Sequence, residues 1–117
     1  MESNWDEGTV LDLKHLRDFT AGDESLEREV LRMFLDNVPD YIRGLMDVPN
    51  SAWAIQSHKI KGAARAIGAW NLAVQAERLE FLEVLPAIGS KERRYLVIDL
   101  EDRIAAVRDQ IEYLGYA

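Results

Sequence analysis

The feature that most constrains the fold is a regular apolar seam in the C-terminal part of the chain. Six apolar residues follow one another there at alternating intervals of three and four: Val97, Leu100, Ile104, Val107, Ile111 and Leu114. This spacing places all six side chains on one face of an α-helix, and such a stripe is stable only when other helices cover it. We therefore predict a helix that starts at Ser90, runs to about Leu114 and packs against several partners.

Helical periodicity describes the rest of the chain as well, and the strict alternation typical of β-strands is absent. It predicts a short helix over 10–19, a long helix that begins after Asp23, a third helix over 51–67 and a fourth from Ala69 to about Leu85. Because the connections are short, successive long helices are expected to run antiparallel. The predicted fold class is all-α, an antiparallel four-helix bundle with an additional short N-terminal helix.

Proline, glycine and short polar residues predict where these helices bend, begin and end. Pro39 falls inside the long helix, where it removes a backbone hydrogen bond, so we expect a kink or a break there. Asn50 or Ser51 is expected to cap the third helix, and Gly68 to end it.

Composition excludes several classes of protein. The 117 residues contain no Cys, which excludes a disulfide framework, a thiolate metal site and a cysteine nucleophile. No apolar run is long enough to span a membrane, and residues 1–9 are predicted to be a loose leader rather than a signal peptide. We therefore expect a cytoplasmic protein with one domain over residues 10–117. The net charge of −7 argues against nucleic acid or an anionic membrane as a partner.

The middle of this acidic chain is locally basic. Residues 48–76 contain no Asp or Glu, but they contain Lys59, Lys61, Arg65 and His58. On a helix, Lys61 and Arg65 lie within about 60° of His58, and the apolar stripe lies on the opposite side. An Ala-rich buried helix would explain the missing acids, but cations around a histidine that faces away from the core favour an anion or phosphate site.

Gly62 lies one helical turn after His58. A glycine inside a helix costs about 1 kcal/mol relative to alanine, so its presence needs a reason. It either leaves room for a partner to approach the imidazole or allows close packing between helices, and the sequence leaves both open.

The segment from His58 to Ala69 resembles a known family. It reads His-x-x-Lys-Gly-Ala-Ala-x-x-x-Gly-Ala, with Leu72, Ala76 and Leu79-Glu80 downstream. This run resembles the histidine-containing phosphotransfer (HPt) domain, and the resemblance extends from about Val10 to Leu114.

The resemblance implies that His58 accepts a phosphoryl group and that the protein is a carrier in a multistep phosphorelay. Lys61 would neutralise phosphate charge and Gly62 would give access, with Lys59 and Arg65 as secondary candidates. The implied partners are response-regulator receiver domains and a hybrid sensor kinase, and the receiver would supply Mg²⁺ and the aspartyl phosphate. No nucleotide-binding motif is present, so we expect no kinase activity and no cofactor or metal of its own. The protein is also expected to be a monomer.

The turn at Gly68 is expected to bring Glu80 to His58. His58 lies ten residues before Gly68 and Glu80 twelve after it, so the two are nearly level in an antiparallel hairpin. Small residues on the fourth helix let the two helices approach closely: Ala69, Ala73 and Ala76. Glu80 would then accept a hydrogen bond from Nδ1–H of His58 and leave Nε2 as the nucleophile.

Two other functions are weighed against phosphotransfer. Glu77, Glu80 and Glu83 recur at intervals of three, but the Glu-x-x-His pairs of carboxylate-bridged metal bundles are absent. A structural or adaptor bundle without transfer activity would share the fold and lack labelling of His58.

The docking patch is expected among apolar residues of the first two helices, and His15 is expected to be a simple surface residue.

Overall fold

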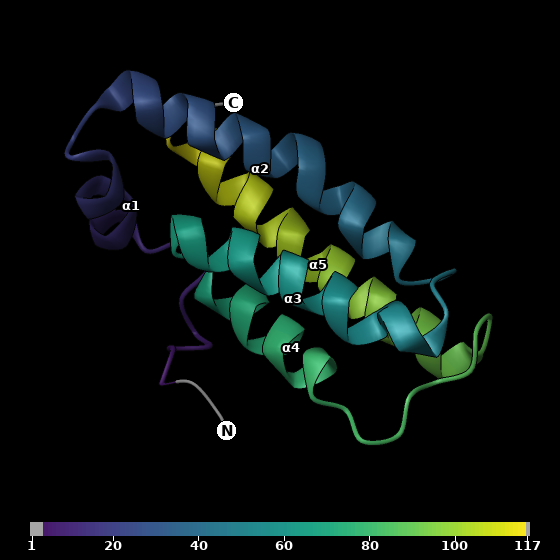
Figure 1. The fold of residues 1–117 in the computed structure, drawn as a ribbon. Helices are drawn as coiled ribbons and strands as arrows, with labels where there is room; N and C mark the ends of the chain where they lie inside the picture. The colour runs from purple at the N-terminus through teal and green to yellow at the C-terminus, as the bar shows by residue number, and fades with distance from the viewer. Residues whose placement is uncertain (1–3, 117) are drawn as a thin grey trace.

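The computed structural model describes residues 4–116, which form five α-helices and no β-strand. In chain order these are α1 (Leu13–Thr20), α2 (Glu24–Gly44), α3 (Asn50–Ile67), α4 (Trp70–Glu80) and α5 (Lys91–Tyr113) (Figure 1). The predicted all-α class is confirmed for this part of the chain. Residues 1–3 of the predicted leader, and residue 117 of the predicted domain, lie outside the described residues.

Local side-chain chemistry explains several helix ends. The side chains of Asp12, Asp23 and Ser90 each accept a hydrogen bond from the backbone N–H three residues later, which caps α1, α2 and α5. Gly68 ends α3 with a φ of 78°, a left-handed conformation that glycine adopts without strain. The predicted roles of Asp23, Ser90 and Gly68 are therefore confirmed.

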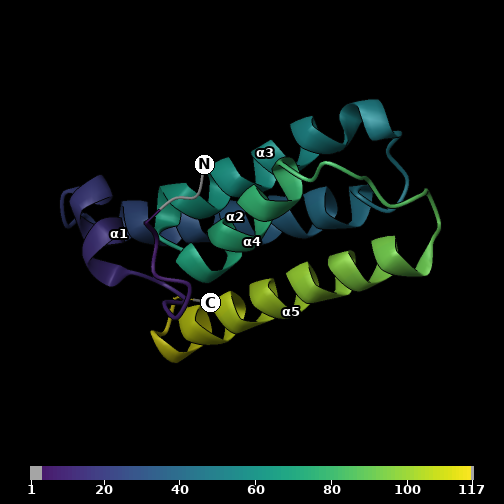
Figure 2. The same ribbon diagram turned by 90° about the horizontal axis from the view of Figure 1, so that it is seen from below.

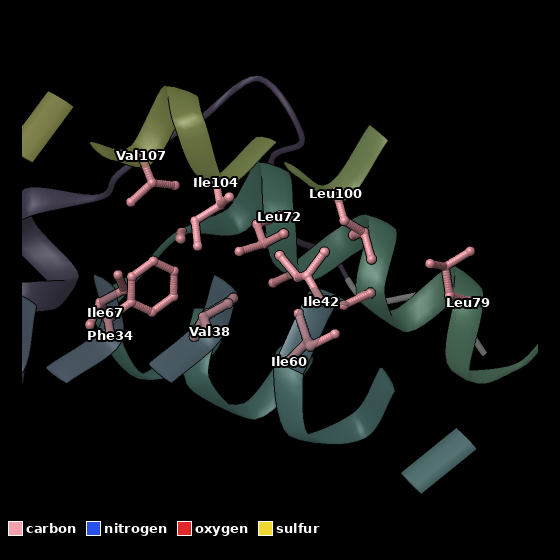
Figure 3. Close-up of a cluster of buried hydrophobic side chains, with 14 of the residues drawn as sticks. Phe34, Val38, Ile42, Ile60, Ile67, Leu72, Leu79, Leu100, Ile104 and Val107 are labelled. Carbon is pink, nitrogen blue, oxygen red and sulfur yellow. The ribbon is translucent and has the colours of Figure 1, made fainter. Parts of the chain in front are cut away.

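The helices α2, α3, α4 and α5 enclose the core, and α1 lies at one end of them (Figures 1 and 2). Each of these four helices contacts two of the other three: α2 packs on α3 and α5, and α4 packs on α3 and α5. The short helix α1 contacts α2 and α3. The shared core draws its side chains from all four helices (Figure 3). In the seam of α5, Val97, Leu100, Ile104, Val107 and Ile111 are buried as predicted, and Leu114 is half-buried.

Small residues line the contact between α3 and α4. Ala64, Ala69, Ala73 and Ala76 are completely buried, so the two helix backbones approach closely. The indole Nε1–H of Trp53 on α3 donates to the carbonyl of Leu79, 2.6 Å away. This bond pairs a carbonyl in the last turn of α4 and fixes the end of that helix against α3.

Two predicted features of the first two helices are corrected. α1 begins at Leu13 rather than at residue 10, because Asp12 occupies the capping position. The predicted break at Pro39 does not occur, because α2 continues as one helix from Glu24 to Gly44. The other predicted outcome, a kink at Pro39, stays a prediction. Val38 and Ile42 are fully buried on either side of the proline, and their packing holds the helix in the core despite the lost backbone hydrogen bond.

The start of α3 and the end of α4 also differ from the prediction. Pro49 holds the N-cap position of α3, and Asn50 is already helical, with its Oδ1 accepting a hydrogen bond from Arg93. α4 ends at Glu80 rather than near Leu85. The following loop is tied down by the buried guanidinium of Arg93, which donates to the carbonyls of Leu45, Val48 and Pro86.

Residues 4–9, from the segment that the sequence assigned to a loose leader, make specific contacts. The ring of Trp5 stacks on Trp70, with the ring centroids 5.6 Å apart. The carboxylate of Glu7 accepts hydrogen bonds from Arg78 on α4 and Arg103 on α5. None of the helices in the described part of the chain has the length and apolarity needed to cross a membrane.

Candidate functional site

His58 projects from the middle of α3 into solvent. Its side chain is 63% exposed, whereas Trp53, Ile60 and Ile67 on the same helix are buried. The amphipathic pattern of α3 thus places the apolar residues in the core and the imidazole on the outer face. An exposed histidine beside a packed helix pair is accessible to a macromolecular partner.

Glu80, at the C-terminal end of α4, lies directly beside the imidazole. The Nδ1 atom of His58 is 2.8 Å from Oε2 of Glu80 and 3.3 Å from Oε1. An ionised carboxylate only accepts hydrogen bonds, so Nδ1 carries the proton in this pair. In a neutral ring, the lone pair then resides on the solvent-facing Nε2. The contact expected from the level hairpin is present.

Lys61 binds the same carboxylate from the other side. Its Nζ lies 2.6 Å from Oε1 of Glu80 and 3.8 Å from Glu77, and it sits over the ring of Phe81. Burial raises the pKa of Glu80, but the hydrogen bonds and charges of Lys61 and His58 lower it below its ordinary value. Glu80 is therefore ionised at neutral pH and suited to hold a protonated Nδ1.

This position of Lys61 differs from the one that its predicted role requires. Only 9% of the side chain is exposed, and the ammonium group is directed toward carboxylates rather than toward solvent. The second acid, Glu77, was noted in the sequence only as part of a rejected metal pattern. The sequence does contain a signal for this ion pair. Glu77 and Glu80 lie three residues apart on α4, and α4 packs against α3, which belongs to the acid-free, basic segment.

Gly62 and the two secondary candidates lie on the exposed side of α3. Apart from the chain neighbours of Gly62 and the nearby backbone of α3, a Cβ atom placed on Gly62 would meet no atom of the described residues within 4 Å, so no neighbouring helix packs against this glycine. Lys59 is exposed. Arg65 is also exposed, and its guanidinium lies 5.4 Å from the ring centroid of Trp5. The sequence did not point to Trp5, because it falls in the segment assigned to the leader.

An apolar groove runs between α1, α2 and α3. Its lining includes Phe19, Val30, Met33, Tyr41 and Ala63. Phe19 and Met33 are more than half exposed although they are large and apolar. These are the kind of docking residues that the sequence placed on the first two helices without identifying them.

His15 is not the simple surface residue that the sequence predicts. It is half-buried, and its ring packs edge-on against Trp70, with the centroids 4.8 Å apart. Among residues 4–116, no three His, Asp or Glu side chains gather in a way that would hold a metal ion.

One of the comparisons with known proteins found a match. The family model described as the Hpt domain matches residues 29–114, which is most of the chain and includes His58, Lys61, Gly62 and Glu80. No curated protein and no solved structure matches the sequence.

Proposed function

The chain belongs to the Hpt domain family, and from this premise we propose that it is a phosphohistidine carrier in which His58 is the phosphoacceptor. The family is associated with histidine phosphotransfer in two-component phosphorelays, as a carrier rather than a kinase. For this chain we propose that His58 receives the phosphoryl group from the aspartyl phosphate of one receiver domain and passes it to a second receiver.

The hydrogen bond between His58 and Glu80 is the observation that carries this proposal. An imidazole is a useful nucleophile when one nitrogen is protonated and held, because the other then keeps its lone pair in a fixed direction. Glu80 holds Nδ1 at 2.8 Å, and 63% of the His58 side chain is exposed.

The proposed transfer is a single displacement. Nε2 of His58 attacks the phosphorus atom, an N–P bond forms, and the P–O bond to the receiver aspartate breaks. The aspartate carboxylate leaves with the electron pair of that bond. The proton stays on Nδ1, so the phosphorylated ring carries a positive charge that the carboxylate of Glu80 stabilises. The reverse displacement delivers the phosphoryl group to the next receiver.

The remaining components of the reaction come from the partner. We propose that the receiver supplies Mg²⁺ as well as the aspartate, and that it docks on the apolar groove beside Gly62. The same proposal includes a hybrid sensor kinase as the upstream source of the phosphoryl group. It also includes a cytoplasmic location, a monomeric state and an antiparallel arrangement of α2–α5. In the proposed transfer, Lys61 acts indirectly, because it positions the carboxylate of Glu80.

A transfer assay tests this function. The purified protein is incubated with a panel of radiolabelled, phosphorylated receiver domains, and a second unlabelled receiver is added afterwards. We expect label to leave the first receiver, to appear on this protein in an acid-labile and base-stable form, and to move on to the second receiver. A chain that takes no label from any receiver would instead be a structural or adaptor bundle of the same fold.

A further inference from the structure

The segment before α1 is anchored along the end of the α3–α4 hairpin. Asn71 at the start of α4 holds it by two bonds, from its backbone N–H to the carbonyl of Thr9 and from its side chain to the carbonyl of Glu7. The N–H of Asp12 donates to the carbonyl of Gly68, and the carboxylate of Asp12 accepts from the indole of Trp70. We call residues 5–12 the N-terminal strap.

The strap places Trp5 between two side chains of the hairpin. One face of the indole stacks on Trp70 at an interplanar angle of 15°. The guanidinium of Arg65 lies over the Trp5 ring at 5.4 Å. This cation–π contact restricts a side chain that would otherwise move freely in solvent, so Arg65 is held ready for a partner.

Arg65 lies on the same face of α3 as His58. The two residues are seven positions apart, which corresponds to two turns, an angular offset of about 20° and a separation of about 10 Å along the axis. Gly62 lies between them. The hollow that Gly62 and Arg65 share is also lined by Trp5, His15, Phe19, Ala66 and Trp70. Phe19 also lines the apolar groove, so the two surfaces are continuous.

The nearby acids do not neutralise this cation. The carboxylate of Glu7 is paired with Arg78 and Arg103, and that of Asp12 accepts from Trp70 and from the backbone N–H of His15. Within the described range, Arg65 takes part in no ion pair. A positive charge is thus presented two turns from the proposed phosphoacceptor, on a protein of net charge −7.

We propose that Trp5 and Arg65 form a receiver-recognition contact, in which Trp5 positions Arg65 against an anionic group on the docked, phosphorylated receiver. This inference rests on the proposed function and adds a specificity determinant to it. The strap precedes residue 29, where the family match begins, so Trp5 is a feature outside the matched range. Complementary charge at the edge of an interface mainly favours encounter and selects among partners.

The test compares two phosphodonors. One is the receiver that labels the wild-type protein fastest in the panel above, and the other is phosphoramidate, a small donor that needs no docking surface. We expect Arg65→Gln to raise the KM for the receiver about 5- to 10-fold with little change in kcat. Trp5→Ala should raise it about 3-fold and should add nothing further in the Arg65→Gln background, because Trp5 acts through Arg65. Rates with phosphoramidate should change far less than rates with the receiver, because this donor needs no docking surface.

Two variants serve as controls. Arg94→Gln removes the same charge from an exposed position on α5 and should leave the receiver KM unchanged. Trp5→Phe keeps an aromatic face and should restore most of the wild-type KM. The inference is overturned if Arg65→Gln behaves like Arg94→Gln, or if Trp5→Ala slows both donors alike, which would indicate a purely structural role. A wild-type protein that takes no label from any receiver, whether or not phosphoramidate labels it, would overturn the proposed function, and this inference with it.

Discussion

The Nζ atom of Lys61 lies 2.6 Å from Oε1 of Glu80, and about nine-tenths of each side chain is buried. The other carboxylate oxygen of Glu80 faces Nδ1 of His58 at 2.8 Å. Glu80 therefore bridges a buried ammonium group and an exposed imidazole. From this relationship we propose that Lys61 supports His58 through the carboxylate rather than by reaching toward a bound phosphate.

Lys61→Met should destabilise the fold by about 2 kcal/mol. The substitution leaves Glu80 buried without its strongest partner, and loss of one member of a buried ion pair costs about 3–5 kcal/mol when burial is complete. The double variant Lys61→Met with Glu80→Gln should recover part of this loss, because no uncompensated charge remains. Urea unfolding of the three proteins measures the difference. Unchanged stability in Lys61→Met would mean that the ion pair does not form and that Lys61 is free to bind phosphate.

Glu80→Ala should slow transfer without abolishing it, because the nucleophile remains but its tautomer is no longer fixed. Glu80→Gln should be milder, since the amide oxygen still accepts a hydrogen bond from Nδ1–H. Nitrogen chemical shifts of the His58 ring, measured by NMR, report which atom carries the proton. The ring should be mainly protonated on Nδ1 in the wild type and mixed in Glu80→Ala. Identical shifts in the two proteins would show that the side chains do not interact in solution.

Much of this site follows from spacing along the sequence. The contact between His58 and Glu80 can be predicted before any packing is known. It follows from the place of His58 opposite the apolar stripe, from the turn at Gly68, and from the similar distances of the two residues from that turn. The direction of Lys61 does not follow in the same way. A lysine near the edge of a helix can extend to solvent or fold back onto a neighbouring helix, and only the position of Glu77 and Glu80 on α4 decides between them.

The fold shows the same division between local and tertiary information. The helix starts at Asp23 and Ser90 and the stop at Gly68 are local and were predicted. The continuity of α2 through Pro39 depends on core packing, which outweighs the lost hydrogen bond. The loop that follows the early end of α4 is held by Arg93, which donates to the carbonyl of Pro86 in that loop and to the carbonyls of Leu45 and Val48, which are distant in sequence. Sequence periodicity contains no signal for such a contact.

Substitutions at Gly62 should separate access from packing. Gly62→Ala adds only a Cβ atom, which meets nothing within 4 Å, so transfer should be retained and stability should rise by up to about 1 kcal/mol. Gly62→Gln should be equally stable but should block transfer from a receiver, because its long side chain reaches the space beside the imidazole. Receiver transfer rates and thermal unfolding test both variants. Normal transfer by Gly62→Gln would show that the docked partner does not approach this side of α3.

The stability contributed by the strap should depend on pH through Glu7. Hydrogen bonds from Arg78 and Arg103 lower the pKa of Glu7 from 4.5 to about 2. A carboxylate with a lowered folded-state pKa stabilises the fold above its unfolded pKa, and this contribution disappears as the pH falls from about 4.5 to about 2. Because the Glu7 side chain is 38% exposed, solvent screening limits the effect to about 1 kcal/mol or less.

Glu7→Gln should therefore be less stable than the wild type at pH 7 and should approach it near pH 2. Chemical unfolding across this range provides the comparison. A difference between the two proteins that stays constant with pH would mean that Glu7 contributes through packing rather than through its charge.

The most direct measurement of the central claim is identification of the phosphorylated residue after transfer from a receiver. The chain contains two histidines, His15 and His58, and the account requires the label on His58 alone. Mass spectrometric mapping of the labelled wild-type protein should place it there. His58→Gln should then accept no label while remaining folded, because the side chain is 63% exposed, and His15→Gln should be labelled normally. Label on His15, or label that persists in His58→Gln, would contradict the account.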